Sequence, residues 1–504
     1  MINRRRKIYY NISISAFTQI LIILLSFFVP RLFISSYGSD VNGLVGTITQ
    51  VLTYVALIES GIGAVTQNAL YKPILNDDKK EICIILTASK KYYERVTIYY
   101  SLTVITIAFF LPLMIQSEVN YWKIFTMVLM EGFSGVLYFL FLEHWKVLLS
   151  VEGKEYIIAQ IDLFTRVLSY LAKLVLALMM FDILYIQVSY FLITLLSIFL
   201  YRCYIKKEYS WVNYTKQCHT ISELNDRKYY MLSDIAWTIF LSTDMVIIST
   251  MMNTTYASIY SVYNMVYVAL SNILFKIYSS IAYVLGQNFH KNIEKYVKIH
   301  DTYELSFILL ISILMSCCSI LTIPFIELYT NGVADIDYIY KFLPFLFGLI
   351  HILSWGRYVS GNLMLISGKS KQASKYSIIE ASLNIILSIT LCIAFGMYGL
   401  LTATIIALSY KVVCVNFYAN RIIMKRSARG TITRIASNLF IYISIEMYSW
   451  WQPLKISTIS QFIIDGFVTL ILVSSYYIFV NIIINYKTAY MIVGNIYRSL
   501  GRQH

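Results

Sequence analysis

Several ionisable side chains stand inside long apolar stretches of this 504-residue sequence, where a charge is costly. Arg166 and Lys173 are seven residues apart, with Asp162 four residues before Arg166 and Tyr170 four after it. At 3.6 residues per turn, these side chains share one face of a helix. Because an ionised group in a bilayer needs a partner or a water-filled cavity, the spacing predicts a polar stripe that lines a cavity. An Asp162–Arg166 ion pair that only stabilises the helix is the alternative.

Further cations occupy other apolar stretches. Lys276 either faces a cavity or extends to the cytosolic interface, since its stretch ends near residue 286. We expect Arg357 to face a cavity because a guanidinium stays charged, and we expect Lys411 to extend to the interface. Arg31 follows Pro30 at the outer end of the first stretch, where it is either an interfacial anchor or a residue at a cavity mouth.

Carboxylates inside the apolar stretches form a second set of candidates: Glu59, Glu131, Asp162, Asp234, Asp244 and Glu380. A buried carboxylate carries a proton or binds sodium, but it serves equally well as the counter-ion of a buried cation. The sequence leaves both roles open for each residue. Asp234 and Asp244 are ten residues apart in one stretch, so they point to different faces of a helix.

The elements that must position these side chains are membrane-spanning helices. With 58% hydrophobic and 13% charged residues and a mean hydropathy of +0.65, the sequence excludes a soluble enzyme, a disordered chain and a disulfide scaffold. Its apolar runs are continuous rather than alternating, which favours an all-α polytopic protein over a β-barrel. About fourteen runs are long enough to span a bilayer: 9–35, 41–66, 95–117, 121–150, 156–180, 182–203, 229–252, 256–285, 304–326, 338–366, 375–395, 397–420, 433–450 and 459–486.

The net charge of +14 is explained by membrane topology, without nucleic acid as a partner. Most of the 41 Lys and Arg residues fall in alternate connections, beginning with Arg4–Lys7 and including Lys146. This pattern predicts that both termini are cytosolic. The first run is too long for a cleaved signal peptide, so we expect a retained helix. The cysteines have no metal-ligand spacing, and we expect neither a metal site nor a structural disulfide.

The spans divide into two halves of similar length. We predict a six-helix lobe over residues 1–205, a basic cytosolic linker over 206–228, a second six-helix lobe over 229–420, and two additional helices with a cytosolic tail over 421–504. Both halves start from the cytosol, which is typical of the parallel repeats found in transporters.

The segment from Pro30 to Arg95 carries a linked set of motifs: Arg31, Gly38, N-G-L at 42–44, E-x-G-I-G at 59–63, Y-K-P at 71–73, and Asp77 or Asp78. This set resembles the polysaccharide transporter family, the Wzx-type flippases of the multidrug/oligosaccharidyl-lipid/polysaccharide exporter superfamily. The resemblance implies a flippase, not an enzyme, in the bacterial cytoplasmic membrane. Its expected substrate is a polyprenyl-diphosphate-linked oligosaccharide, such as an O-antigen, capsule or exopolysaccharide repeat unit, moved from the inner to the outer leaflet.

The resemblance also implies two six-helix lobes in a V around a cationic cavity of alternating access. In this cavity we expect Arg166, Lys173, Lys276 and Arg357 to hold the diphosphate or an acidic sugar, with Arg31 at the mouth, because arginine and lysine suit that role. No cofactor is expected, and a proton or sodium gradient is the expected driving force. Membrane lipid, a polysaccharide polymerase and chain-length machinery are the expected partners.

Three alternatives remain open. A lipid II flippase of cell-wall synthesis also has fourteen spans, although the Y-K-P motif favours the polysaccharide branch. A multidrug antiporter of the same superfamily usually has twelve spans and favours cationic drugs, which buried cations oppose. A membrane polysaccharide polymerase or glycosyltransferase needs a substantial external loop, and the longest external connection, near 327–337, is short. The sequence has no Walker A loop, so ATP-driven transport is not expected. It also has no HExxH motif and no convincing Ser–His–acid pattern, so hydrolysis is not expected.

Overall fold

The regular elements of the described chain are all helices. The computed structural model describes residues 4–488 apart from 60–61, 213–226, 292 and 487, and no strand occurs within that part. The predicted all-α fold is therefore confirmed. The chain forms two compact units, Met1–Ser258 and Ile259–His504. The lobe boundaries expected at 205 and 229 stay predictions, and most of the basic linker lies outside the described residues.

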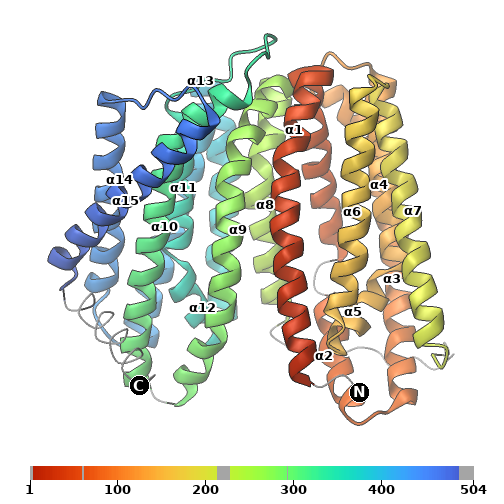
Figure 1. Ribbon diagram of the computed structural model, residues 1–504. Helices are drawn as coiled ribbons and strands as arrows, with labels where there is room; N and C mark the ends of the chain where they lie inside the picture. The colour runs from red at the N-terminus through yellow and green to blue at the C-terminus, as the bar shows by residue number, and fades with distance from the viewer. Residues whose placement is uncertain (1–3, 60–61, 213–226, 292, 487, 489–504) are drawn as a thin grey trace. The chain divides into compact units, whose positions relative to one another are not determined.

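The first unit is a bundle in which α1 packs against α6 and α8, α3 against α4, and α7 against both α4 and α6. Figure 1 shows α3, α4, α6 and α7 running side by side. Its helices are α1 (Arg4–Ala56), α2 (Ile62–Leu75), α3 (Lys79–Met114), α4 (Tyr121–Phe141), α5 (Glu143–Val151), α6 (Glu155–Leu178), α7 (Ile183–Glu208) and α8 (Arg227–Met251).

The second unit is built on α10, which packs against α11, α14 and α15, while α13 packs against α11 and α12. Its helices are α9 (Thr254–Lys291, which begins at the end of the first unit), α10 (Ile293–Tyr329), α11 (Leu343–Trp355), α12 (Tyr358–Ile366), α13 (Ser370–Tyr418), α14 (Arg429–Trp451) and α15 (Ile459–Ile484). The adjacent Cys317 and Cys318 are buried in its core, and the described cysteines are free thiols.

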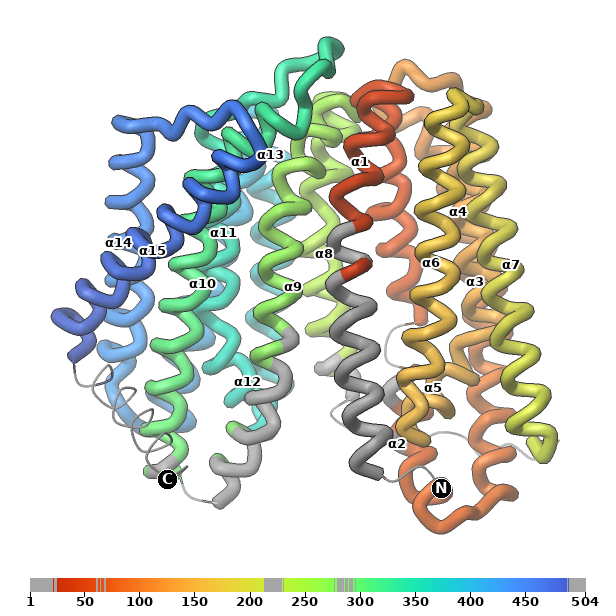
Figure 2. The backbone as a smooth tube through the Cα atoms, viewed as in Figure 1, coloured from red at the N-terminus to blue at the C-terminus, as the bar shows by residue number. Residues whose placement is uncertain are grey.

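Two of the helices each join two predicted spans, although α1 ends at Ala56 and the span predicted at 41–66 also includes a short 3₁₀ helix (Leu57–Glu59) and the start of α2. In α1 the chain leaves helical geometry at Gly38, where φ is 84°, and in α13 it does so at Gly396, where φ is 58°. Glycine alone adopts such positive φ values without strain, so it permits a reversal with almost no intervening loop. Figure 2 shows the tube of α1 turning back near its upper end. The predicted pairs 9–35 with 41–66 and 375–395 with 397–420 are therefore joined by single glycines.

Two other predicted spans each consist of two shorter helices. The span predicted at 121–150 consists of α4 and α5, and the span at 338–366 consists of α11 and α12. Side chains start several helices, since Asn120 accepts a hydrogen bond from the backbone N–H of Trp122 and Asp182 accepts one from that of Leu184. Nine helical stretches in the described residues are long and apolar enough to cross a membrane by themselves.

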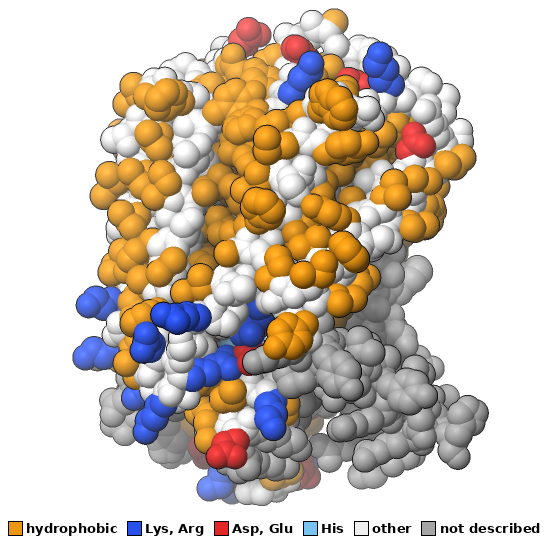
Figure 3. All heavy atoms as spheres, turned by 90° about the vertical axis from the view of Figure 1, so that its left-hand side faces the viewer, with side chains coloured by type: hydrophobic (Ala, Val, Ile, Leu, Met, Phe, Trp, Pro, Cys, Tyr) orange, Lys and Arg blue, Asp and Glu red, His pale blue; other side chains and the backbone are white. Residues whose placement is uncertain are grey.

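The outer surface is apolar at mid-height. On α15, the side chain of Phe467 is 64% exposed and that of Ile471 also 64%, and Phe440 on α14 is 68% exposed. Figure 3 shows a face of the second unit on which hydrophobic side chains cover the middle, while most Lys and Arg side chains gather near the lower end. Such a surface is stable in lipid and not in water, so the chain is a multi-pass membrane protein.

Candidate functional site

A cavity of about 550 Å³ lies within the first unit. Its walls are formed by α1, α4, α6 and α7, and many of its side chains are polar. The polar wall consists of Thr49, Glu131, Tyr138, Asp162, Thr165, Arg166, Ser169, Tyr170, Lys173, Gln187, Tyr190, Thr194 and Ser197. A polar chamber between helices of membrane length is a place where a hydrophilic group can be held within the bilayer.

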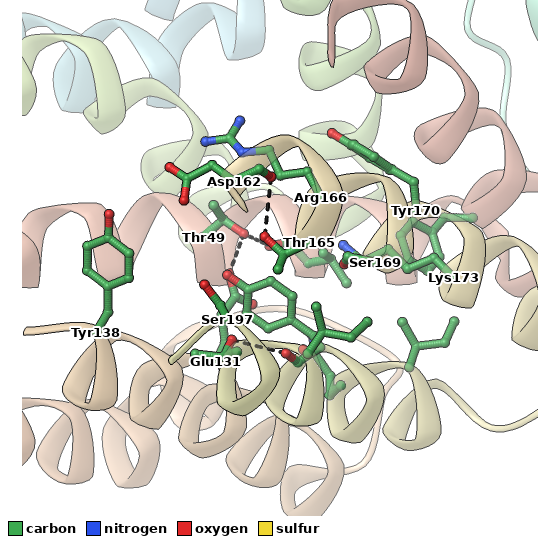
Figure 4. Close-up of a pocket in the computed structure, with 17 residues that line it drawn as sticks. Thr49, Glu131, Tyr138, Asp162, Thr165, Arg166, Ser169, Tyr170, Lys173 and Ser197 are labelled. Carbon is green, nitrogen blue, oxygen red and sulfur yellow. Dashed lines mark hydrogen bonds between the residues drawn. The ribbon is translucent and has the colours of Figure 1, made fainter. Parts of the chain in front are cut away.

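The four residues of the predicted stripe all line this cavity. Asp162, Arg166, Tyr170 and Lys173 project from α6, and Figure 4 shows them with Glu131 and Ser197 on the opposite side. The 3.6-residue period explains the shared face. Arg166 is near the middle of α6, which runs from Glu155 to Leu178 and, at about 36 Å, is long enough to cross a bilayer.

Asp162 is paired with a residue that the sequence pattern does not suggest. Both of its carboxylate oxygens lie 3.0 Å from Nζ of Lys146, and the hydroxyl of Tyr201 donates to Oδ1 at 3.0 Å. The Lys146 ammonium also donates to the hydroxyl of Tyr138. The alternative of an isolated Asp162–Arg166 pair on α6 is therefore not what the structure contains.

Glu131 and Lys173 form the other charged part of the cavity. The Thr49 hydroxyl donates to Oε1 of Glu131 at 2.7 Å, and the Lys173 ammonium lies 5.5 Å from the ring centroid of Tyr190. Both groups thus have protein partners, although each still lines the cavity.

Arg166 differs from the other charged residues of the cavity. Its side chain is exposed, and no hydrogen bond or ion pair within the described residues engages its guanidinium. A guanidinium presents five N–H donors in a planar fork that matches carboxylate and phosphate oxygens. Arg166 is therefore the side chain best suited to take an anionic group from a ligand.

A second group of predicted residues meets inside the second unit. Glu380 is fully buried on the first half of α13, where it forms an ion pair with Lys411 from the second half. Nη2 of Arg357 lies 4.0 Å from Oε1 of Glu380. Arg357 stands at the break between α11 and α12, where Asn416 donates to the carbonyl of Gly356 at 2.9 Å.

This group includes two residues whose roles were predicted from the sequence, Lys411 and Glu380. Lys411 was expected to extend to the interface, but its side chain is buried and paired, because Glu380 compensates its charge. Glu380 has the geometry of a counter-ion. Arg357 belongs to the same charged group and is mostly buried.

The remaining predicted residues lie elsewhere. Arg31 is half-buried on α1 and is not among the described residues that line the cavity. The side chain of Lys276 lies outside the described residues. Glu59 accepts a hydrogen bond from Tyr93 at 3.0 Å. On α8, Asp234 is exposed and Asp244 is 4% exposed, in agreement with their expected separation on the helix.

Sequence reasoning missed two parts of the site. Lys146 was assigned to a cytosolic loop, but it is buried on α5, because the break after α4 turns it toward Asp162. Lys146 lies inside the predicted span 121–150, and this position could have indicated that it is buried. The neutral polar side chains of α7, among them Gln187, Tyr190 and Thr194, carry no charge to draw attention, although they recur at helical spacing.

One group of side chains has the composition of a metal site. Ligand atoms of His300, Asp301 and Glu304 lie within 4.8 Å of one another. Two guanidiniums already engage the carboxylates: Arg426 donates to both oxygens of Asp301, at 2.8 and 2.7 Å, and Arg434 donates to Asp301 and Glu304. This arrangement is an ion-pair network that joins α10 to α14 rather than a cation site.

No protein-family model and no curated protein matches the sequence. Solved structures do match. Over 93% of this chain and 98% of the other, the fold is similar to the lipid II flippase MurJ in an inward closed conformation, with a TM-score of 0.63 and 15% identity.

Two multidrug transporters also match. An inward-facing MATE family transporter of the MOP superfamily matches over 86% of this chain and 99% of its own, with a TM-score of 0.55 and 13% identity. DinF-BH, a MATE multidrug transporter solved with R6G, matches over 83% and 97%, with a TM-score of 0.57 and 15% identity. The chain therefore has the all-helical fold that is found in the flippase MurJ and in MATE transporters.

Proposed function

We propose that this protein is a flippase that moves a polyprenyl-diphosphate-linked oligosaccharide from the inner to the outer leaflet of the bacterial cytoplasmic membrane by alternating access. The observation that carries the proposal is the exposed guanidinium of Arg166, in a polar cavity at the middle of α6. Water in the cavity or a counter-ion stabilises such a cation, and no carboxylate within the described residues pairs with Arg166, so the anion of a ligand can take that place. A diphosphate is an anion whose oxygens match the guanidinium fork.

The remainder of the cavity suits the sugar. Hydroxyl and amide groups of Ser169, Gln187, Thr194 and Ser197 line the wall together with the rings of Tyr170 and Tyr190. Such groups form hydrogen bonds with sugar hydroxyls, and the volume of about 550 Å³ is in the range of small-ligand sites. In this proposal the polyprenyl tail stays in the bilayer while the headgroup enters the cavity.

The proposal has three further parts that rest on the sequence. The termini are cytosolic, in keeping with the distribution of Lys and Arg. A proton or sodium gradient drives the cycle, without a cofactor or an enzymatic step, and Glu131, Glu59, Asp234 and Asp244 are the carboxylates to test for coupling. A polysaccharide polymerase and chain-length machinery receive the product.

A lipid II flippase is the second candidate, favoured by the match to MurJ over 93% of this chain. Lipid II carries the same diphosphate, so the role of Arg166 would be unchanged. The MATE matches support a drug antiporter less well, because an exposed cavity guanidinium repels cationic drugs.

Flipping by the purified protein in liposomes tests the proposal. Fluorescent lipids are added, and the fraction that an external quencher cannot reach is followed in time. We expect a polyprenyl-diphosphate oligosaccharide to flip at least about tenfold faster than its monophosphate analogue, since one charge-assisted contact is lost. Faster flipping of lipid II would favour the second candidate. Equal rates for diphosphate and monophosphate, or transport of cationic dyes alone, would contradict both.

A further inference from the structure

A second cavity in the first unit shares no lining residue with the cavity around Arg166. Its volume is about 800 Å³, and its walls come from α3, the junction of α4 and α5, and α7. We call it the α3–α7 groove. Its basic residues are Lys90, Arg202 and Lys206, and its large apolar ones include Phe141, Trp145 and Phe199.

The groove lies where the apolar outer surface ends. On α3 the exposed aliphatic side chains begin at Ile98, which is 60% exposed, and on α7 the exposed large apolar residues end at Phe199, which is 61% exposed. The helix α3 has 36 residues and is roughly 54 Å long, more than the hydrocarbon thickness of about 30 Å. Its first turns therefore extend beyond the hydrocarbon. Figure 1 shows the start of α3 and the end of α7 at the same, lower end of the first unit.

Charge and apolar surface are ordered along α7. Phe199, Arg202 and Lys206 have helical spacing and share one face, so the aromatic ring faces the apolar side and the two cations follow toward the helix end. The Arg202 guanidinium lies 5.6 Å from the ring centroid of Phe141. This order matches an amphiphile that has an acyl chain on one side and a charged headgroup on the other.

The cations of α7 are available to a ligand. Glu94 contributes the acidic side chain of the groove, and its Oε1 lies 3.9 Å from Nζ of Lys90. Within the part of the chain that the structure describes, no ion pair engages Arg202 or Lys206, and both side chains are exposed. Glu94 therefore compensates Lys90, and the groove keeps an excess of positive charge at its α7 wall.

We infer that the α3–α7 groove binds an anionic phospholipid, with its phosphodiester at Arg202 and Lys206 and an acyl chain against Phe141 and Phe199. Cations near a membrane surface attract anionic lipids. A free phosphate would use the cations and leave the adjoining exposed rings uncovered. The site is distinct from the transport cavity, so the inference does not depend on the substrate proposed above.

Cys203 provides a probe inside the groove. It is an exposed thiol that lines the wall between Arg202 and Lys206, while Cys414 in the second unit is half-buried and serves as an internal reference. The full chain is reconstituted in nanodiscs of phosphatidylcholine, with or without phosphatidylglycerol, and alkylated with N-ethylmaleimide. Peptide mass spectrometry follows each cysteine separately. We expect phosphatidylglycerol to slow alkylation of Cys203 at least about fivefold relative to Cys414.

Matched variants separate a bound lipid from a general effect of surface charge. In R202Q/K206Q the slowing should disappear, whereas K207Q, which removes an adjacent exposed cation outside the groove, should keep it. Each basic residue near an anionic lipid contributes roughly fivefold to binding, so the double variant should bind about thirtyfold more weakly. Native mass spectrometry of retained phosphatidylglycerol measures this loss directly.

Three results would overturn the inference. Equal alkylation of Cys203 with and without phosphatidylglycerol would show that no anionic lipid occupies the groove. Equal slowing in wild type and R202Q/K206Q would assign the effect to the lower surface pH of the anionic bilayer. Equal slowing by inorganic phosphate in phosphatidylcholine nanodiscs would replace the lipid with a soluble anion.

Discussion

The Lys146 ammonium on α5 donates hydrogen bonds to both carboxylate oxygens of Asp162 on α6, with 3.0 Å between Nζ and each oxygen. This ion pair crosses between two helices and leaves Arg166, four residues along α6 from Asp162, without a carboxylate partner in the described residues. Lys146, which is not among the lining residues, compensates Asp162, while Arg166 lines the cavity. The distinction is the basis of the proposed role of Arg166.

Removal of the Lys146 ammonium should destabilise the first unit and change the charge of the cavity. In K146M, Asp162 loses its partner, and we expect a loss of about 2 kcal/mol, because Asp162 is 30% exposed and the full penalty of a broken buried pair does not apply. The thermal midpoint should fall by roughly 2–4 °C. The double variant K146M/D162N should recover most of the loss. A K146M variant as stable as wild type would contradict the ion pair.

The buried group of the second unit should be strongly non-additive. E380Q leaves Lys411 and Arg357 without their shared carboxylate, and we expect a loss of about 3–5 kcal/mol. In E380Q/K411M one cation is also removed, so the double variant should be more stable than E380Q alone. Thermal unfolding of the purified variants measures both. E327Q, an exposed carboxylate on α10, is the control that should have no effect. Additive losses would show that the charges do not interact.

Substitution of Gly38 should disturb the reversal inside α1. At φ 84° and ψ 167°, the backbone is in a region open essentially to glycine, and G38A should cost about 1–3 kcal/mol. The matched control is G361A in α12, where an added Cβ meets only Val415 at 3.9 Å. That variant should be neutral or slightly more stable, because alanine favours a helix interior. Equal stabilities of G38A and G361A would contradict the reversal at residue 38.

Stability should depend on Asp182 at acid pH. The hydrogen bond from Lys123 and that from the backbone of Leu184 hold the pKa of the Asp182 carboxyl below its usual value. A lowered pKa in the folded state stabilises the protein above about pH 4, and this stabilisation is lost as the pH falls through the folded pKa. Because the pair is exposed, the contribution is below about 1 kcal/mol.

The variant D182N isolates that charge, since asparagine still caps α7. The difference in thermal midpoint between wild type and D182N should shrink from pH 6 to pH 3. A difference that stays constant over this range would contradict the assigned pKa shift.

Continuous apolar runs predicted the helices well because a span in lipid must satisfy its own backbone hydrogen bonds. The polar stripe of α6 was also predictable, since the period of an α-helix alone places Arg166 and Lys173 on one face. The break between α4 and α5 could not be predicted, because no proline or glycine lies at Leu142, where the two helices meet. The pairing of Lys146 with Asp162 depends on that break, and the pairing of Lys411 with Glu380 depends on the reversal at Gly396.

Equilibrium binding measures whether Arg166 holds the diphosphate of a lipid-linked sugar. A short-chain polyprenyl-diphosphate disaccharide is titrated into the purified wild-type protein, R166Q, and R95Q, in which an exposed arginine outside the cavity is replaced. We expect R166Q to bind the diphosphate at least about tenfold more weakly than wild type and R95Q to bind it as wild type does. Wild type and R166Q should bind a monophosphate analogue with equal affinity. Equal affinity of wild type and R166Q for the diphosphate would contradict this role of Arg166.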